Sequence, residues 1–310
     1  MGKATREAYG NALARIGKEN TNIIVLDADL SKSTKTDTFK NVCPERFFNV
    51  GIAEQNLISV GAGLAAAGKI PFVSSFAMFA TGRAFEQIRN AVCYPKLNVK
   101  VCATHAGITV GEDGATHQSL EDISCMRTLP NMTVVVPADE RETEAVVEWA
   151  ASYEGPVYVR LGRAGVDDVT AEGYTFVPGK STTLVEGSDV TIIGCGALVG
   201  PAVEAAKTLA ESNVSVRVIN MASIKPIDAD AIVKAATETG AIVTAEEHNI
   251  IGGLGSAVSE VVVANKPVPM EFVGVQDTFG ESGTPKELMA KYGLTAKDIV
   301  EAVKRVITRK

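Results

Sequence analysis

The chain has 310 residues, of which 46% are hydrophobic and 22% are charged, and its formal net charge is −7. This composition is typical of a globular protein of about two domains and excludes a disordered chain. Acidic and basic residues are interspersed without a basic stripe, so we expect neither a nucleic acid nor an anionic membrane surface as a partner.

The cysteines and the N-terminus both favour a cytoplasmic protein. Five cysteines are scattered along the chain without a CxxC pair, as is common in a reducing compartment. The first residues run into an amphipathic pattern without the apolar region of a signal peptide, and no apolar stretch is long enough to span a membrane. With only three histidines, we expect no metal site built from imidazoles on this chain.

In the first half of the sequence, predicted helices alternate with short apolar strands. We expect helices over residues 4–18, 55–67, 78–92 and 140–152. We expect strands over residues 23–26, 47–50, 71–75, 99–103, 133–137 and 157–161. Loops without secondary structure are expected over residues 27–34 and 104–120. The alternation predicts a mostly parallel sheet that is covered by helices on both faces.

Residues 166–185 show no sustained period, and we interpret them as a linker between two domains. The alternation then resumes. We expect strands over residues 189–193, 214–219, 241–245 and 271–275, and helices over residues 199–212, 228–239, 253–264, 285–292 and 296–308. The sequence therefore predicts an α/β protein with a first domain over residues 1–165 and a smaller α/β domain over residues 186–310.

One carboxylate stands at a chemically favourable position. The apolar run Phe47 to Ile52 leads to Glu54, and a helix rich in small residues follows. In an open α/β sheet, reactive groups lie where strands end and helices begin, which makes Glu54 a candidate. The alternative is a helix-start carboxylate that only interacts favourably with the helix dipole.

The predicted loop over residues 104–120 is a second candidate. It contains His105 and His117 together with acidic residues and several glycines, a combination suited to a polyol or a phosphorylated substrate. An ordinary glycine-rich loop is the alternative. Phe76 and Phe79 precede it. Their spacing suits a core position, but facing Glu54 they would form an aromatic platform for a planar ring.

Strings along almost the whole chain resemble the transketolase family. FFNVGIAEQN, SSFAMFATGRAFEQIR and THAGITVGEDGATHQSLEDIS resemble its pyrimidine-binding domain, and EEHNIIGGLGS resembles its C-terminal domain. Full-length members begin with a further domain, whose GDG…N motif holds Mg²⁺ and the diphosphate of thiamine diphosphate. No Gly-Asp-Gly string occurs in this sequence. The resemblance implies the C-terminal subunit of a split transketolase, which pairs with an N-terminal subunit that binds Mg²⁺, as a heterotetramer.

The resemblance also implies roles for individual residues in transfer of a two-carbon ketol unit between sugar phosphates. Glu54 matches the glutamate that bonds the pyrimidine ring nitrogen of thiamine diphosphate and shuttles a proton there. Phe76 and Phe79 match the aromatic residues around that ring. The family's next aromatic residue, a tyrosine, is replaced by Gly82, and a neighbour, Arg83 or Phe85, is the candidate to fill the gap.

A second set of matched residues faces the sugar substrate. His117 and Asp113 match residues at the carbonyl and hydroxyl groups of the donor. The outer cleft that holds the sugar phosphate is matched by His105, Arg163, Arg6 and Ser33. Arg160 is an alternative to Arg163.

Three other functions share parts of the pattern. GIAEQ and GRAFEQ are similar to strings of 1-deoxyxylulose-5-phosphate synthases, so the C-terminal part of such an enzyme is one alternative. The β subunit of a 2-oxo acid dehydrogenase has a similar domain order and length. A non-catalytic scaffold partner is the third. The set of His105, Asp113 and His117 favours transketolase, because it suits a polyol.

Overall fold

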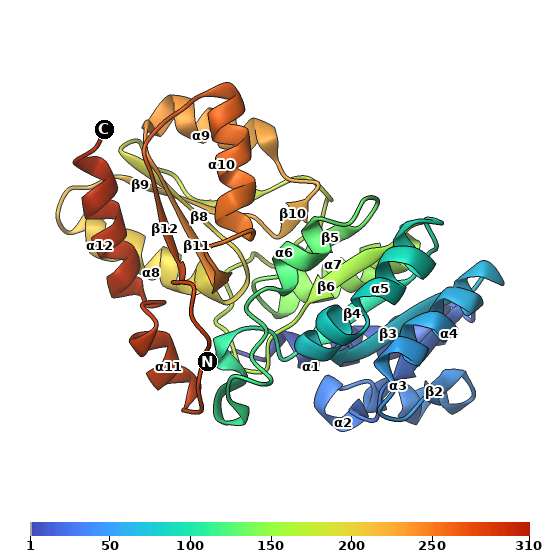
Figure 1. Cartoon of the computed structure of the whole chain (residues 1–310). Coiled ribbons are helices and arrows are strands. Elements are labelled where there is room, and N and C mark those ends of the chain that lie inside the picture. Colours follow the sequence, from blue (N-terminus) through green and yellow to red (C-terminus); the bar gives the residue numbers. More distant parts are fainter. Residues whose placement is uncertain (1) are drawn as a thin grey trace.

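In the computed structural model, which describes residues 2–310, the chain forms two β-sheets, each covered by helices on both faces (Figure 1). The predicted fold class, α/β with mostly parallel sheets, is confirmed. The domain limits at residues 165 and 186 stay a prediction.

The first sheet has seven strands in the order β10-β5-β6-β4-β3-β1-β2. They are β1 (Ile23–Asp27), β2 (Phe47–Asn49), β3 (Ile70–Phe76), β4 (Lys100–Thr104), β5 (Thr133–Val135), β6 (Val157–Arg160) and β10 (Ser223–Lys225). All neighbours run parallel except β10, which is antiparallel to β5. The central strands are buried along their whole length, as expected for a parallel sheet with two covered faces.

The helices of the first sheet divide between its two faces. One face packs against α1 (Thr5–Glu19), α3 (Asp37–Val42) and α7 (Glu140–Ser152). The other packs against α4 (Glu54–Ala66), α6 (Asp122–Arg127) and the helical segment Met78–Cys93. That segment is predicted as one helix. It consists of two π-helical stretches, η2 (Met78–Arg83) and η3 (Ile88–Cys93), around a short α5 (Phe85–Gln87).

The second sheet has five strands in the order β12-β11-β8-β9-β7. They are β7 (Thr182–Val185), β8 (Val190–Gly194), β9 (Val216–Asn220), β11 (Ile242–Asn249) and β12 (Met270–Val275). One face packs against α8 (Val199–Ala210) and α12 (Ala296–Ile307), the other against α9 (Ala229–Thr239) and α10 (Leu254–Asn265). Strand β7 is antiparallel to β9, so the last residues predicted as linker belong to this sheet.

Two connections tie the halves of the chain together. Strand β10 comes from the second half of the sequence but pairs with β5 in the first sheet, where the Val136 amide also donates to the Ala222 carbonyl (2.8 Å). The Asn220 side-chain amide donates to both carboxylate oxygens of Glu142 in α7, each at 2.9 Å. Because Glu142 is buried, this contact fixes β9 against the first sheet.

Short elements occupy two stretches predicted as loops, and those predictions are wrong in this respect. Residues 27–34 contain α2 (Ser31–Thr34), and residues 104–120 contain the 3₁₀ helix η4 (Ile108–Asp113). Glycines at positive φ, Gly107 and Gly114, flank η4, and the Gln118 side-chain amide donates to two carbonyl oxygens within it. These contacts, and not a regular helical series of backbone hydrogen bonds, hold the segment, so the sequence shows no helical period there. The remaining 3₁₀ turns are η1 (Pro44–Arg46) and η5 (Gly196–Leu198).

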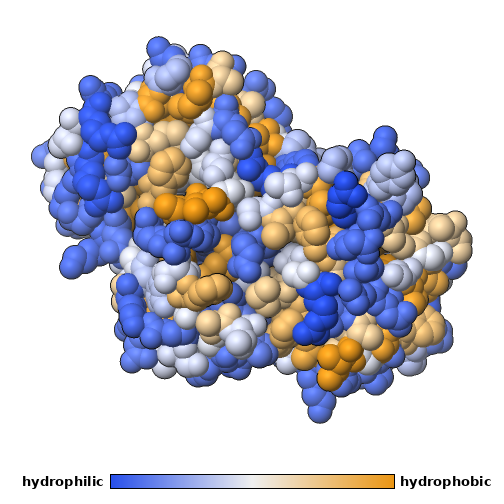
Figure 2. All heavy atoms as spheres, in the orientation of Figure 1, coloured by the Kyte–Doolittle hydropathy of each residue, from blue (hydrophilic) through white to orange (hydrophobic). Residues whose placement is uncertain are grey.

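The surface shown in Figure 2 alternates between hydrophilic and hydrophobic areas without one continuous apolar belt. None of the helices formed by residues 2–310 combines the length and the apolar character needed to cross a bilayer.

Helix α4, which begins at Glu54, packs closely on β3 through small residues. A Cβ atom on Gly61 would lie 2.7 Å from Val73 Cγ1, whereas one on Gly63 would meet no atom within 4 Å. We expect Gly61→Ala to destabilise the protein by about 1–3 kcal/mol through overpacking. Gly63→Ala on the same helix should stabilise it by up to about 1 kcal/mol. Urea unfolding monitored through Trp149, the single tryptophan, measures both effects, and shifts of the same sign would contradict this packing.

Candidate active site

Glu54 is the first residue of α4 and is 1% exposed. A tight turn leads to it from β2, with Gly51 at φ 75°. Its Oε2 atom accepts a hydrogen bond from Arg83 Nη1 at 2.7 Å, and the Arg83 guanidinium lies 5.0 Å from the centre of the Phe79 ring. A buried carboxylate, a cation and an aromatic face thus meet at the N-terminus of α4.

Phe76 and Phe79 lie between Glu54 and the two histidines of the following loop. Their rings are stacked with centroids 6.0 Å apart. Phe76 also stacks on His105 at 3.8 Å, and Phe79 meets the edge of His117 at 5.2 Å. Neither phenylalanine belongs to the three hydrophobic core clusters. Phe76 is buried all the same, with 6% exposure, whereas Phe79 is partly exposed, so the aromatic platform stays a prediction.

His105 follows β4 in the left-handed region, with φ 56°, and is 3% exposed. Arg6 Nη1 lies 3.3 Å from its Nε2, and Thr104 Oγ1 lies 2.9 Å from its Nδ1. Since a guanidinium can only donate, Nε2 accepts and the proton resides on Nδ1. Burial, and then the positive charges of Arg6 and Arg163, lower the pKa of His105 to about 3, so its imidazole is neutral at physiological pH.

This lowered pKa predicts a pH dependence of stability. Unfolded His105 takes up a proton below its ordinary pKa of about 6.5, while folded His105 does so only near 3. His105 therefore lowers the free energy of unfolding progressively as the pH falls from about 6.5 towards 3. We expect His105→Gln to flatten the pH profile of urea unfolding in that window. In the NMR spectrum, the His105 ring signals should not titrate between pH 7.5 and about 4.5, and a midpoint near 6 would contradict the assignment.

Arg6 and Ser33, which the resemblance places at a phosphate, lie next to His105. The Arg6 Nη1 atom donates to the Ser33 carbonyl oxygen at 2.9 Å, so the contact is with the backbone and not with the hydroxyl. Arg6 Nε is buried and has no hydrogen-bond partner. A buried guanidinium nitrogen without an acceptor suits an anion that completes its hydrogen bonds.

Arg163 contacts acidic residues of η4. Its Nη1 donates to Glu112 Oε2 at 3.0 Å and to the Val110 carbonyl, and lies 4.0 Å from Asp113 Oδ2. Its charge also lowers the pKa of Arg6, after the larger effect of burial. Arg163 and Asp113 are therefore neighbours, and both are partly exposed.

Arg160, the alternative to Arg163, is buried and engaged elsewhere. Its Nε donates to Asp122 Oδ2 at 2.8 Å, and its Nη2 donates to the Glu247 carbonyl oxygen at 2.8 Å. The guanidinium thus joins α6 to β11 inside the protein. Of the two arginines, Arg163 is the partly exposed one, with 34% exposure against 5% for Arg160, and its role at a phosphate stays a prediction.

The two candidates beside Gly82, Arg83 and Phe85, have different surroundings. Phe85 packs partly buried against the hydrophobic core, whereas Arg83 reaches Glu54 and Phe79. The matched residues then form one series of contacts. Arg83 contacts Glu54 and Phe79, and the Phe79 ring contacts His117. On the other side of Phe79, Phe76 stacks on His105, and His105 contacts Arg6, which is bonded to Ser33. The sequence predicts for Arg83 only that it, or Phe85, occupies the space left by the missing tyrosine at Gly82. The position of Arg83 four residues after Phe79 on a helix is the signal that could have assigned the contact.

The site has the features needed for one end of thiamine diphosphate. The acid Glu54 and the stacked Phe76 and Phe79 suit the ring nitrogen and the face of an aminopyrimidine. Residues 2–310 contain no group of three His, Cys, Asp or Glu side chains arranged to hold a metal ion.

Two protein families match the sequence. The family described as transketolase, pyrimidine binding domain, matches residues 1–167, and the family described as transketolase, C-terminal domain, matches residues 179–299.

Individual proteins give the same picture. The chain is 50% identical over 304 residues to a Methanocaldococcus jannaschii protein described provisionally as a transketolase C-terminal section, covering 97% of this chain and 95% of the relative. It is 43% identical over 305 residues to the 6-deoxy-6-sulfo-D-fructose transketolase subunit SqwH of Clostridium sp., covering 98% and 95%. A solved structure entitled split gene transketolase, inactive beta4 tetramer, superimposes with a TM-score of 0.94 at 59% identity and covers all of both chains.

Proposed function

This chain belongs to the transketolase family, and from that membership we propose that it is the C-terminal subunit of a split transketolase. In this proposal it takes part in thiamine diphosphate-dependent transfer of a two-carbon ketol unit from a ketose phosphate to an aldose phosphate. The relatives that match nearly end to end are named as sections or subunits of transketolases, which supports a separate subunit.

The observation that carries the proposal is the continuous contact series between a cofactor half and a sugar half. Glu54, Arg83 and Phe79 form the first half, and His105 and Arg6 belong to the second. Phe76 joins the halves by stacking between Phe79 and His105. Ketol transfer needs these two halves side by side, because the group is transferred at the cofactor while the sugar phosphate is held beyond it.

Each residue has a role that follows from its chemistry. Glu54 holds a proton at the pyrimidine ring nitrogen and exchanges it there, and the surrounding burial keeps water from that position. Phe76 and Phe79 orient the ring. When bound, thiamine diphosphate supplies an electron sink for the carbon–carbon bond that breaks.

The sugar half acts through hydrogen bonds and charge. His105 is neutral with its proton on Nδ1, while Arg6 and Arg163 supply positive charge to the phosphate. Asp113 on η4 and His117 in the following loop orient the hydroxyl and carbonyl groups of the donor. The Clostridium relative is named for a sulfosugar, so the family accommodates more than one acceptor or donor.

The partner completes the site. We propose that an N-terminal subunit with a GDG…N motif holds Mg²⁺ and the diphosphate, and that two copies of each subunit form a heterotetramer in the cytoplasm. The solved relative is entitled an inactive beta4 tetramer, which supports self-association of this kind of chain and our expectation that the chain alone is inactive. The five unpaired cysteines suit a reducing compartment.

Reconstitution tests the proposal. The chain alone, with Mg²⁺, thiamine diphosphate and a ketose and aldose phosphate, should show no ketol transfer. Adding the N-terminal subunit should produce transfer and a complex whose mass, by sedimentation, equals two copies of each chain. Transfer by the chain alone, or an assembled complex inactive on all pentose and hexose phosphate pairs, would contradict it.

A further inference from the structure

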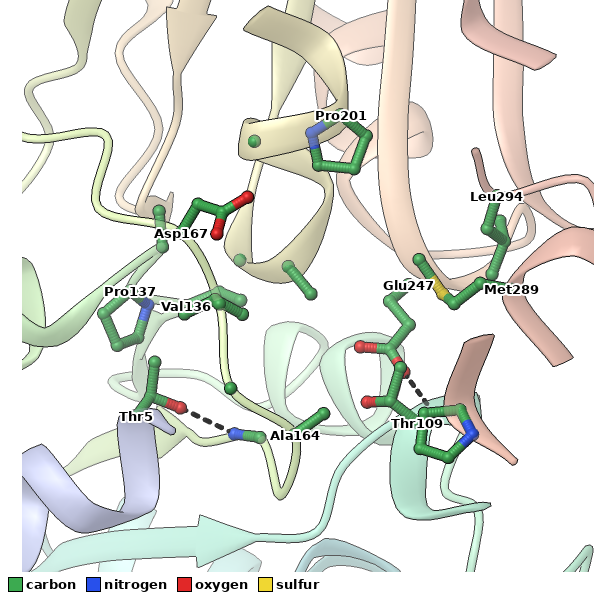
Figure 3. Close-up of a pocket in the computed structure, with 18 of the residues that line it drawn as sticks. Thr5, Thr109, Val136, Pro137, Ala164, Asp167, Pro201, Glu247, Met289 and Leu294 are labelled. Atoms are coloured by element: carbon green, nitrogen blue, oxygen red, sulfur yellow. Dashed lines mark hydrogen bonds between the residues drawn. The ribbon is translucent and has the colours of Figure 1, made fainter. Parts of the chain in front are cut away.

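A cavity of about 460 Å³ lies between the two halves of the chain (Figure 3), and Glu54 is not among the residues that line it. Its walls come from the ends of β5 and β6, from η5 and the start of α8, and from the segment around α11 (Pro285–Lys291). Most of the lining is apolar, including Val136, Pro201, Met289 and Leu294. The size lies in the range of pockets that bind small organic molecules.

One buried acid faces this apolar space. Glu247, near the end of β11, is 3% exposed, and Figure 3 shows its carboxylate directed into the cavity, with Met289 and Thr109 close by. Its Oε1 atom accepts a hydrogen bond from the Thr109 amide at 2.6 Å. No Lys, Arg or His within residues 2–310 forms an ion pair with it. Burial raises the pKa of Glu247, and the nearby Arg160 lowers it only in part.

Arg160 does not serve as the missing counter-ion. Its guanidinium is bonded to the Asp122 carboxylate and to the backbone oxygen of Glu247, so its charge is balanced inside the protein. The Thr109 amide donates to one oxygen of Glu247, but a buried carboxylate without an ion-pair partner still favours a cation beside it. The cavity gives such a group access, and its lining includes two further acids, Asp167 and Glu204, as well as two basic residues, Arg160 and Lys286.

We propose that this cavity is a binding site for a small organic amine with an apolar body, whose ammonium group is held by Glu247. The apolar walls bury the body of the amine, and Glu247 supplies the counter-charge. Thr109, which lines the cavity and donates its amide to Glu247, belongs to η4, the segment that also carries Asp113. The site does not depend on the proposed ketol transfer, since no residue of the Glu54 cluster lines it.

Three probes of similar size and different charge test the proposal: phenethylamine, 2-phenylethanol and phenylacetate. The full chain is labelled with ¹³C at the methionine methyl groups, so that Met289 reports on the cavity and Met78, beside Gly82, reports on the Glu54 site. We expect phenethylamine to shift the Met289 signal and to bind at least about tenfold more tightly than the alcohol, with no shift from phenylacetate.

Two variants and a control locate the binding. Glu247→Gln keeps the shape of the side chain and should weaken phenethylamine binding at least about tenfold. Gly200→Leu should abolish binding by filling the cavity, because a Cβ at Gly200 meets no atom within 4 Å and the position is helical. Glu148→Gln on α7, an exposed acid that does not line the cavity, should leave the affinity unaltered. Equal binding of all three probes, an unaltered affinity in Glu247→Gln and Gly200→Leu, or a shift of Met78 without Met289 would overturn the proposal.

Discussion

Replacing Glu54 by glutamine should reduce ketol transfer of the reconstituted complex at least about a hundredfold, because general acid–base catalysis contributes about 10²–10⁴-fold. The amide has the shape of the carboxylate but cannot exchange a proton at the pyrimidine ring nitrogen. Arg83 loses the negative charge to which it is bonded at 2.7 Å, while the buried packing of the α4 N-terminus stays the same. Initial rates with a ketose and an aldose phosphate measure the effect.

The control for this experiment separates chemistry from assembly. Sedimentation of Glu54→Gln with the N-terminal subunit should give the same mass as the unchanged complex. Glu148→Gln removes an exposed acid from α7, on the opposite face of the first sheet, and should leave the rate unaltered. Turnover near the original value in Glu54→Gln would make Glu54 a helix-start carboxylate without a chemical role.

Arg160→Met should reduce the free energy of unfolding by about 3–5 kcal/mol, since it leaves a buried acid without its partner. Asp122 is fully buried, and its Oδ2 accepts hydrogen bonds from Arg160 Nε and from the Tyr158 hydroxyl. Burial alone would raise the pKa of Asp122, but the charge of Arg160 holds it below its ordinary value. The carboxylate is therefore ionised at neutral pH, and its contribution is lost only as the pH falls through the lowered pKa. Urea unfolding at pH 7 measures the loss.

Two comparisons make the Arg160 result specific. Arg15→Met breaks an exposed ion pair with Glu148 and should cost at most about 1 kcal/mol. The double variant Arg160→Met/Asp122→Leu removes both charges and should recover a large part of the stability, because apolar side chains often replace a buried pair without penalty. If the double variant is as unstable as Arg160→Met alone, the lost backbone bond to Glu247, and not the unpaired acid, is the cause.

The sequence was informative where local periodicity and a strong motif coincide. Helix α7 begins and ends at the predicted residues, since its apolar residues repeat on one face and Asp139 caps it. Glu54 follows β2 and His105 follows β4. The residues around Glu54 and those around His105 lie together, because these two strands end at the same edge of one parallel sheet.

Features that depend on contacts distant in sequence were not predictable in the same way. Three residues, Ser223–Lys225, are too short to show a strand pattern, and only their pairing with β5 makes them β10. The π-helical stretches around Phe85 have the composition of an ordinary helix. The choice between Arg160 and Arg163 depends on Asp122, which lies 38 residues before Arg160 and whose burial no local pattern reveals.

Strand β10 has a consequence for how the protein is made. About 90 residues separate β5 from β10, so at about 5–20 residues per second the ribosome releases β5 several seconds before the strand that covers its edge. An uncovered edge strand is a template for a strand of another chain. During this interval the uncovered β5 strands of nascent chains on one messenger RNA can pair with each other. The yield of native protein then depends on the translation speed of residues 136–222 and on chaperones that shield the edge, even if the finished fold is stable.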